Sequence, residues 1–142
     1  MCQISHLHFN FALALDKAFR NTTSGYVHVQ LFVLPSRYES FGLAAAEALA
    51  HGLPVVAFAD CPGANEVIRD NENGILVRGA RRAEALSCAL RTLMAASDLR
   101  VALGRVGPAS VAMFSKENVC DQWEKLLRAF CSEDDALQRG LG

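Results

Sequence analysis

The chain is 142 residues long, 51% hydrophobic and 20% charged, with 14 Lys and Arg against 15 Asp and Glu and a formal net charge of -1. This length predicts one soluble globular domain, because domains typically contain roughly 100 to 200 residues. The near-neutral balance excludes nucleic-acid binding by bulk electrostatics, which needs a strongly basic surface. The apolar content also excludes a disordered chain.

Residues 1–26 carry no chemical motif. Phe9, Leu13 and Phe19 have the spacing of an amphipathic helix. The apolar run at 9–15 follows no Lys or Arg and is far shorter than the roughly 20 residues of a membrane span. We therefore expect neither a signal peptide nor a transmembrane segment.

From residue 27 onward, short apolar runs alternate with helical patterns. The runs predict strands at 29–34, 55–59 and 75–77, and the helical patterns predict a helix at 43–51, closed by Gly52, and a short one at 64–68. This order predicts an α/β fold, a parallel sheet with helices on its faces. If earlier strands are missing, the strand at 29–34 has an apolar edge that residues 1–26 or a partner must cover.

The C-terminal part is helical by pattern. We predict a helix over 83–94, a second that Asp98 caps and that runs to Leu103, and a last helix capped by Ser115. Its apolar stripe, including Trp123, is expected to pack in the core, and residues 132–142 are expected to form a polar, frayed tail. The pair Asn73-Gly74 is expected to be a turn with positive φ.

Metal and disulfide chemistry are not expected. The five cysteines contain no C-x-x-C pair, which predicts reduced thiols, and the histidines lack metal-ligand spacing. His51, beside Gly52 at the end of a predicted helix, suits the negative end of the helix dipole. Arg81 and Arg82 precede a predicted helix and are expected to be solvated.

The segment from Glu39 to Glu47 carries the functional signal, because it joins a predicted strand to a predicted helix. Ligands of open parallel sheets bind outside the carboxyl ends of the strands. Gly42 allows backbone to approach a ligand closely, and the amides of Phe41, Gly42 and Leu43 fall at the helix N-terminus, which favours an anion such as a diphosphate.

Two acids flank this anion site. Glu47 lies about 6 to 9 Å along the helix axis from its start, and Glu39 precedes the helix. A carboxylate accepts the paired hydrogen bonds that vicinal sugar hydroxyls donate. The combination fits a ligand built from sugar, diphosphate and ribose, although Glu47 taken alone is better explained as a solvated or salt-bridged surface acid.

These motifs resemble the donor-binding half of retaining glycosyltransferases of the GT-B fold, family 4 (glycosyl transferases group 1), and above all the bacterial enzymes of exopolysaccharide and lipopolysaccharide synthesis. The resemblance runs over about residues 26–131 and rests on LPSRYESFGL at 34–43, EALAHGLPVVA at 47–57, EVI at 66–68 and ENGILV at 72–77. It implies a partial Rossmann-like sheet at 27–131 that binds a nucleotide sugar.

The resemblance also implies roles for individual residues. Glu39 takes the catalytic position facing the donor sugar, Glu47 holds the ribose, and the backbone amides at 41–43 bind the diphosphate and sugar. The donor-binding set is Glu39, Ser40, Phe41, Gly42, Leu43 and Glu47. The implied donor is a UDP- or GDP-sugar, with neither a cofactor nor a metal ion. Glu66 is a further candidate for the cleft or a buttress of its own loop, and Arg37 would meet a phosphate or form a salt bridge.

The chain departs from the family's two-domain pattern. Only the second, donor-binding domain is matched, and the basic segment that neutralises the donor diphosphate in the family is not visible upstream of Val27. We expect a cytoplasmic parent enzyme, peripheral to the inner membrane, that transfers a hexose or related sugar to a glycan or lipid-linked acceptor bound by the missing N-terminal domain. Alone, the chain is expected to be inactive or nearly so; the alternatives are a non-catalytic nucleotide-sugar-binding module and an inactive truncated fragment without a ligand.

Overall fold

The computed structural model of the protein describes residues 12–13 and 29–139, with side chains over 29–131. The chain divides after Val111 into two compact units. The first holds the sheet and the helices packed on it, and the second is helical, so each is described by itself.

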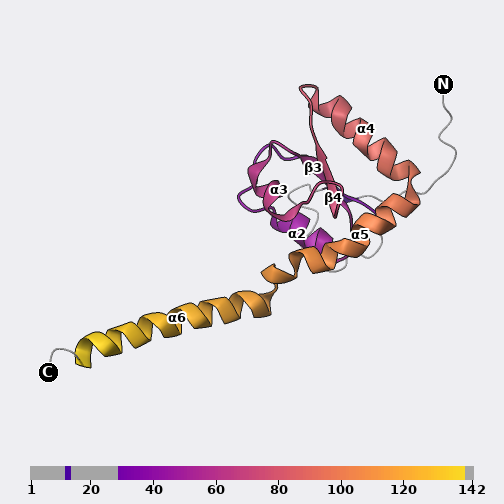
Figure 1. The fold of residues 1–142 in the computed structure, drawn as a ribbon. Coiled ribbons are helices and arrows are strands. Elements are labelled where there is room, and N and C mark those ends of the chain that lie inside the picture. The colour runs from indigo at the N-terminus through magenta and orange to yellow at the C-terminus, as the bar shows by residue number, and fades with distance from the viewer. Residues whose placement is uncertain (1–11, 14–28, 140–142) are drawn as a thin grey trace, which may run out of the picture. The chain divides into compact units, whose positions relative to one another are not determined.

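The first unit is built on a four-stranded parallel sheet in the order β1-β2-β3-β4, of which Figure 1 labels β3 and β4. The strands are Ala12–Leu13, Phe32–Leu34, Val55–Phe58 and Gly74–Val77. Every residue of β2 and β3 is buried, as expected of continuous apolar runs in a parallel sheet covered on both faces. The α/β fold with a small parallel sheet is confirmed.

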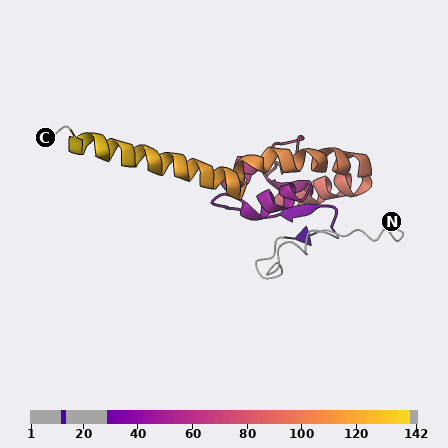
Figure 2. The same cartoon turned by 90° about the horizontal axis from the view of Figure 1, so that it is seen from below.

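Strand β1 lies within the N-terminal segment whose apolar spacing is compatible with an amphipathic helix. Ala12 and Leu13 are extended and pair with Phe32 and Val33 of β2, so these two residues are not helical (Figure 2). A strand edge offers N–H and C=O groups that need partners, and here residues 12–13 pair with this edge of β2. Of the alternatives considered for the β2 edge, cover by residues 1–26 is confirmed at these two residues, and the rest of that segment lies outside the described residues.

Helices α2 (Leu43–Ala50) and α5 (Ser97–Val111) pack against each other through glycine (Figure 1). A β-carbon at Gly104 would lie 2.2 Å from the carbonyl oxygen of Gly52, and one at Gly107 would lie 2.5 Å from that of Leu49. The prediction that this helix is capped by Asp98 and stops at Leu103 is wrong. Its glycines lower helix propensity, but they permit the close contact with α2.

Two further helices complete the first unit. Helix α3 (Pro62–Val67) begins two residues before the predicted position, with proline at its start, where the missing N–H costs nothing. Helix α4 (Arg82–Ala95) packs against β3 and β4.

Asn73 ties the turn before β4 to the rest of the unit. Its buried side-chain amide donates to the carbonyl of Val67 at 3.1 Å and to the hydroxyl of Ser110 at 2.8 Å, and its side-chain oxygen accepts from the Arg69 N–H at 2.8 Å. The prediction of positive φ at Asn73-Gly74 is wrong. The left-handed residue is Asn71, with φ 63°, and Gly74 begins the strand.

The second unit consists of a 3₁₀ turn (Ala112–Phe114) and the long helix α6 (Lys116–Arg139). The Ser115 hydroxyl accepts the N–H of Asn118 at 3.3 Å, which confirms the predicted cap. The helix continues to Arg139, so the frayed tail predicted from Ser132 is wrong over 132–139.

The predicted core role of the α6 stripe is not met within this unit. Trp123 is 60% exposed, and its apolar neighbours on the stripe are exposed as well: Val119, Leu126, Leu127 and Phe130. None of the helices in the described part of the chain is both long enough and apolar enough to cross a bilayer.

Candidate functional site

The connection from β2 to α2, residues 35–42, ends in a backbone geometry that leaves the helix start uncapped. Gly42 is left-handed, with φ 81° and ψ 41°, and its carbonyl accepts the N–H groups of Ala45 at 2.9 Å and Ala46 at 3.0 Å. Glycine has no side chain to cap the helix, and the first turn contains no acidic residue. Because the first N–H groups of a helix have no intrahelical acceptor, those of Leu43 and Ala44 form an anion-binding end.

Helix α3 holds the middle of this connection in place. A β-carbon at Gly63 would lie 2.2 Å from the carbonyl oxygen of Glu39 and 2.8 Å from the amide nitrogen of Phe41, so only glycine permits the contact. A β-carbon at Gly42 would in turn lie 3.1 Å from the carbonyl oxygen of Gly63. The 61–66 segment therefore lies directly against the backbone of the connection.

The polar side chains at 37–40 have no partners among the described residues. Over the residues that the structure describes, Arg37, Tyr38, Glu39 and Ser40 make no side-chain hydrogen bond and no ion pair. Arg37, Tyr38 and Ser40 are exposed, whereas Glu39 is half-buried. A half-buried carboxylate without a partner beside an uncapped helix start is able to accept hydrogen bonds from a polyhydroxyl ligand.

Glu47 lies on the same helix, four residues after Leu43 and about 6 Å along the axis. Its side chain is exposed. One turn further, the Nδ1 atom of His51 lies 2.8 Å from the Glu47 carbonyl oxygen, and the left-handed Gly52 closes the helix with φ 74°. The predicted structural role of His51 at the helix end is confirmed.

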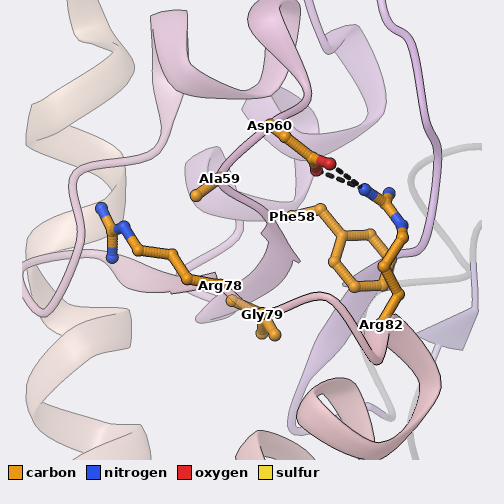
Figure 3. Close-up of a pocket in the computed structure, with 7 residues that line it drawn as sticks. Phe58, Ala59, Asp60, Arg78, Gly79 and Arg82 are labelled. Atoms are coloured by element: carbon orange, nitrogen blue, oxygen red, sulfur yellow. Dashed lines mark hydrogen bonds and ion pairs between the residues drawn. The ribbon is translucent and has the colours of Figure 1, made fainter.

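A second group of charges lies at the ends of β3 and β4, around a cavity of about 300 Å³ (Figure 3). Its charged residues are paired: Arg82 with Asp60, and Arg78 with Asp70 at 2.6 Å. The residues that line it are Phe58, Ala59, Asp60, Val77, Arg78, Gly79 and Arg82.

The prediction that Arg82 is solvated is wrong. Arg81 is solvated as expected, with 81% of its side chain exposed, but the Arg82 side chain is only 21% exposed and its guanidinium lies 3.6 Å from the centre of the Phe58 ring. The pairing could have been suspected from two features of the sequence. Arg82 begins the helix after β4, and Asp60 follows the neighbouring strand β3.

The pKa of the Asp70 carboxyl is lowered in the folded protein. Burial raises the pKa of Asp70, but the hydrogen bonds from the Arg78 guanidinium and the Leu76 N–H, the latter at 2.8 Å, outweigh burial and hold that pKa below its usual value. The described residues include no cluster of three His, Cys, Asp or Glu side chains able to hold a metal ion. Cys61 is a buried free thiol, and Cys88 is an exposed one.

The geometry thus brings together most of the predicted site residues. Glu39, Ser40, Phe41 and Gly42 lie in one connection, Leu43 begins the helix that follows it, and Glu47 lies about one turn along that helix. Arg37 lies in the same connection. Glu66 is exposed on α3 and makes no hydrogen bond or ion pair among the described residues, so the buttressing role considered for it is not seen.

Comparison with known proteins places this connection in a family. The sequence model of the family described as "Glycosyl transferases group 1" matches residues 15–109, more than half of the chain. The chain belongs to this family. The match includes the whole 35–42 connection and helix α2.

A curated relative and solved structures are also similar to this chain. The chain is 36% identical over 104 residues to a D-inositol 3-phosphate glycosyltransferase of Corynebacterium urealyticum, covering 73% of this chain and 24% of that protein. It superposes on sucrose-phosphate synthase from Thermosynechococcus elongatus with a TM-score of 0.67 and 35% identity, over 76% of this chain and 27% of that one.

A third match has bound nucleotide. A structure of TarM from S. aureus in complex with UDP matches with a TM-score of 0.60 and 28% identity, over 69% of this chain and 20% of that one. The chain therefore spans about a quarter of the length of each of these three proteins.

Proposed function

We propose that this group 1 glycosyltransferase domain binds the nucleotide-sugar donor of a retaining, family 4 enzyme at the start of α2. The observation that carries the proposal is the unpaired polar side chains of residues 37–40 beside the uncapped helix that begins after Gly42. The UDP found in the TarM complex supports a nucleoside diphosphate as the ligand class.

Each part of the site has a role in this proposal. The amides at 42–44 bind the diphosphate, because a helix N-terminus offers both N–H groups and a positive dipole end. The half-buried Glu39 carboxylate faces the donor sugar as the catalytic residue of the site, and Glu47 accepts hydrogen bonds from the ribose hydroxyls. Arg37 adds positive charge near the phosphates, and Glu66 faces the same cleft.

The helix start also serves departure of the leaving group. Cleavage of the sugar–phosphate bond places negative charge on the nucleoside diphosphate, and preorganised N–H donors stabilise charge that develops in a transition state. We propose a UDP- or GDP-sugar as donor, without a metal ion or other cofactor, and a glycan or lipid-linked acceptor in cytoplasmic polysaccharide synthesis.

We further propose that this chain alone binds donor without transferring its sugar. The acceptor would be bound by the part of the relatives that the chain does not match, about three quarters of their length. A radiolabelled transfer assay on the purified 142-residue chain is expected to show no turnover above background. Turnover would contradict this step and leave donor binding in place.

Donor binding is tested by calorimetric titration of the chain with UDP and GDP. Replacement of Glu47 by Gln is expected to weaken binding about tenfold, because a hydrogen bond to a charged acceptor is stronger than one to a neutral acceptor. The matched control is Glu84→Gln, which removes another exposed carboxylate from the first turn of α4. Absence of nucleotide binding, or an equal loss in both variants, would refute the proposal.

A further inference from the structure

At the carboxyl edge of the sheet, Arg82 links the start of α4 to the segments that follow β2 and β3. It is the first residue of α4, and its Nη2 donates to the carbonyl of Ser36, just after β2, at 3.2 Å. Its Nη1 donates to both carboxylate oxygens of Asp60, two residues after β3, as Figure 3 shows. The ends of β2 and β3 are therefore held by one side chain.

The guanidinium is suited to this task. It is planar and presents several N–H donors in a fixed fork, so one group serves two acceptors while its face stacks on an aromatic ring. Phe58 supplies that ring, 3.6 Å from the guanidinium carbon. The side chain is only 21% exposed, and it combines an ion pair, a stacking contact and a hydrogen bond to backbone.

The backbone group that Arg82 holds belongs to the candidate donor site. Ser36 lies three residues before Glu39 in the 35–42 connection. Gly63 fixes the same connection further along, through its close contact with the backbone of Glu39 and Phe41. The connection is thus held near its start by Arg82 and in its second half by α3.

We propose that Arg82 is a positioning residue for the donor site. By holding the Ser36 carbonyl, it fixes the path of the connection that carries Glu39 and leads to the helix start at Gly42. This inference rests on the proposed function, since it assigns Arg82 a role in binding the same nucleoside diphosphate. Arg82 acts through the connection and does not contact the ligand.

The chain contains a matched control beside the residue of interest. Arg81 carries the same charge one position earlier, but it pairs with Glu84 on its own helix at 3.0 Å and is 81% exposed. Titration of the full chain with UDP is expected to show about tenfold weaker binding for Arg82→Ala, because small misplacements of a site cost large factors. Arg81→Ala is expected to stay within about twofold of wild type, as exposed pairs contribute little.

A second readout separates positioning from general loss of stability. Amide hydrogen exchange at residues 39–42 is expected to accelerate in Arg82→Ala, with exchange in β3 and β4 unchanged. Arg82→Lys keeps the charge and the side-chain stem but lacks the planar fork, so we expect an intermediate loss of UDP affinity, about threefold. If Arg82→Ala does not fold, the lysine variant and its exchange pattern provide the test.

These experiments distinguish a failure of the positioning role of Arg82 from a failure of the proposed donor binding. Equal UDP affinity in wild type, Arg82→Ala and Arg82→Lys would overturn the positioning role and leave donor binding intact. Equal weakening in Arg81→Ala and Arg82→Ala would also overturn it, because charge alone would then explain the loss. If the wild-type chain binds neither UDP nor GDP, the proposed function fails and this inference fails with it.

Discussion

Two strand-to-helix connections at the carboxyl edge of the sheet, those after β2 and after β4, use their polar residues in opposite ways. In the 35–42 connection, between β2 and α2, the side chains at 37–40 have no partner among the described residues. After β4, Arg78 pairs with Asp70, Arg81 with Glu84, and Arg82 with Asp60. The arginine-rich connection therefore stabilises the fold, and the one without partners is available for a ligand.

The first turns of helices α2 and α4 also differ in charge. Neither α2, which begins at Leu43, nor α4 has a side-chain cap, but the first turn of α2 contains no acid, whereas that of α4 contains Glu84. A carboxylate near a helix N-terminus offsets the positive dipole end. The cavity at the ends of β3 and β4 is thus a weaker candidate for an anion site than the start of α2. The two arginines of the cavity are already paired with carboxylates, whereas no acid lies in the first turn of α2.

The largest expected effect comes from filling the contact between α3 and the 35–42 connection. Gly63→Ala would place a β-carbon 2.2 Å from the Glu39 carbonyl oxygen, so backbone must move. We expect loss of about 2 to 3 kcal/mol in the free energy of unfolding, as in overpacked cores. UDP affinity in a calorimetric titration should fall by about a hundredfold, because the displaced backbone carries the site.

Gly104→Ala is the control for this substitution. Its β-carbon would lie equally close, 2.2 Å, to a backbone oxygen, that of Gly52, on the side of α2 that faces α5. We expect a similar loss of stability in urea unfolding, with UDP affinity changed by less than about threefold below the unfolding transition. Equal losses of affinity in both variants would show that the contact at Gly63 has no special link to the ligand.

Smaller effects are expected from replacing Arg37, which has no partner among the described residues, and Arg78, which pairs with Asp70. Arg37→Ala should weaken UDP binding about fivefold and leave the unfolding midpoint unchanged, since this side chain has no partner among the described residues. Arg78→Ala should leave UDP affinity unchanged and cost about 0.5 to 1 kcal/mol of stability through loss of the Asp70 pair. The reverse pattern would contradict the division between the two connections.

Most of the fold followed from periodicity. The buried strands β2 and β3 are continuous apolar runs, and α2 is an alanine-rich stretch closed by Gly52, so local sequence and tertiary position agree. The N-terminal strand and the length of α5 did not follow. Both depend on neighbours: β1 on pairing with β2, and α5 on the close packing of Gly104 and Gly107 against α2.

The candidate site was predictable where it is local in sequence. The spacing of Glu39, Gly42 and Glu47 locates a strand end, a helix start and a position one turn along the helix. Arg82 was missed because its partners lie 22 and 46 residues earlier in the chain, at Asp60 and Ser36. Contacts of that separation are fixed by the register of parallel strands, which composition and periodicity do not contain.

The smallest expected effect concerns the charge pair that anchors β4 to its preceding turn. The folded-state pKa of Asp70 is lowered, so its carboxylate contributes stability above its unfolded-state pKa of about 4. That contribution is lost as the pH falls through the folded-state pKa, and it is absent once both states are protonated. Urea unfolding between pH 3 and 7 should therefore show a steeper acid loss of stability for wild type than for Asp70→Asn.

At neutral pH, Asp70→Asn should lower the free energy of unfolding by up to about 1 kcal/mol, since the pair with Arg78 is partly exposed and the asparagine oxygen still accepts the Leu76 N–H. Glu72→Gln is the control, because its ion pair with Arg69 is long, at 3.9 Å, and exposed. UDP affinity at pH 7 should be the same in both variants as in wild type. A change in affinity with Asp70→Asn would mean that the β4 end takes part in ligand binding, and the contrast between the two connections would then not hold.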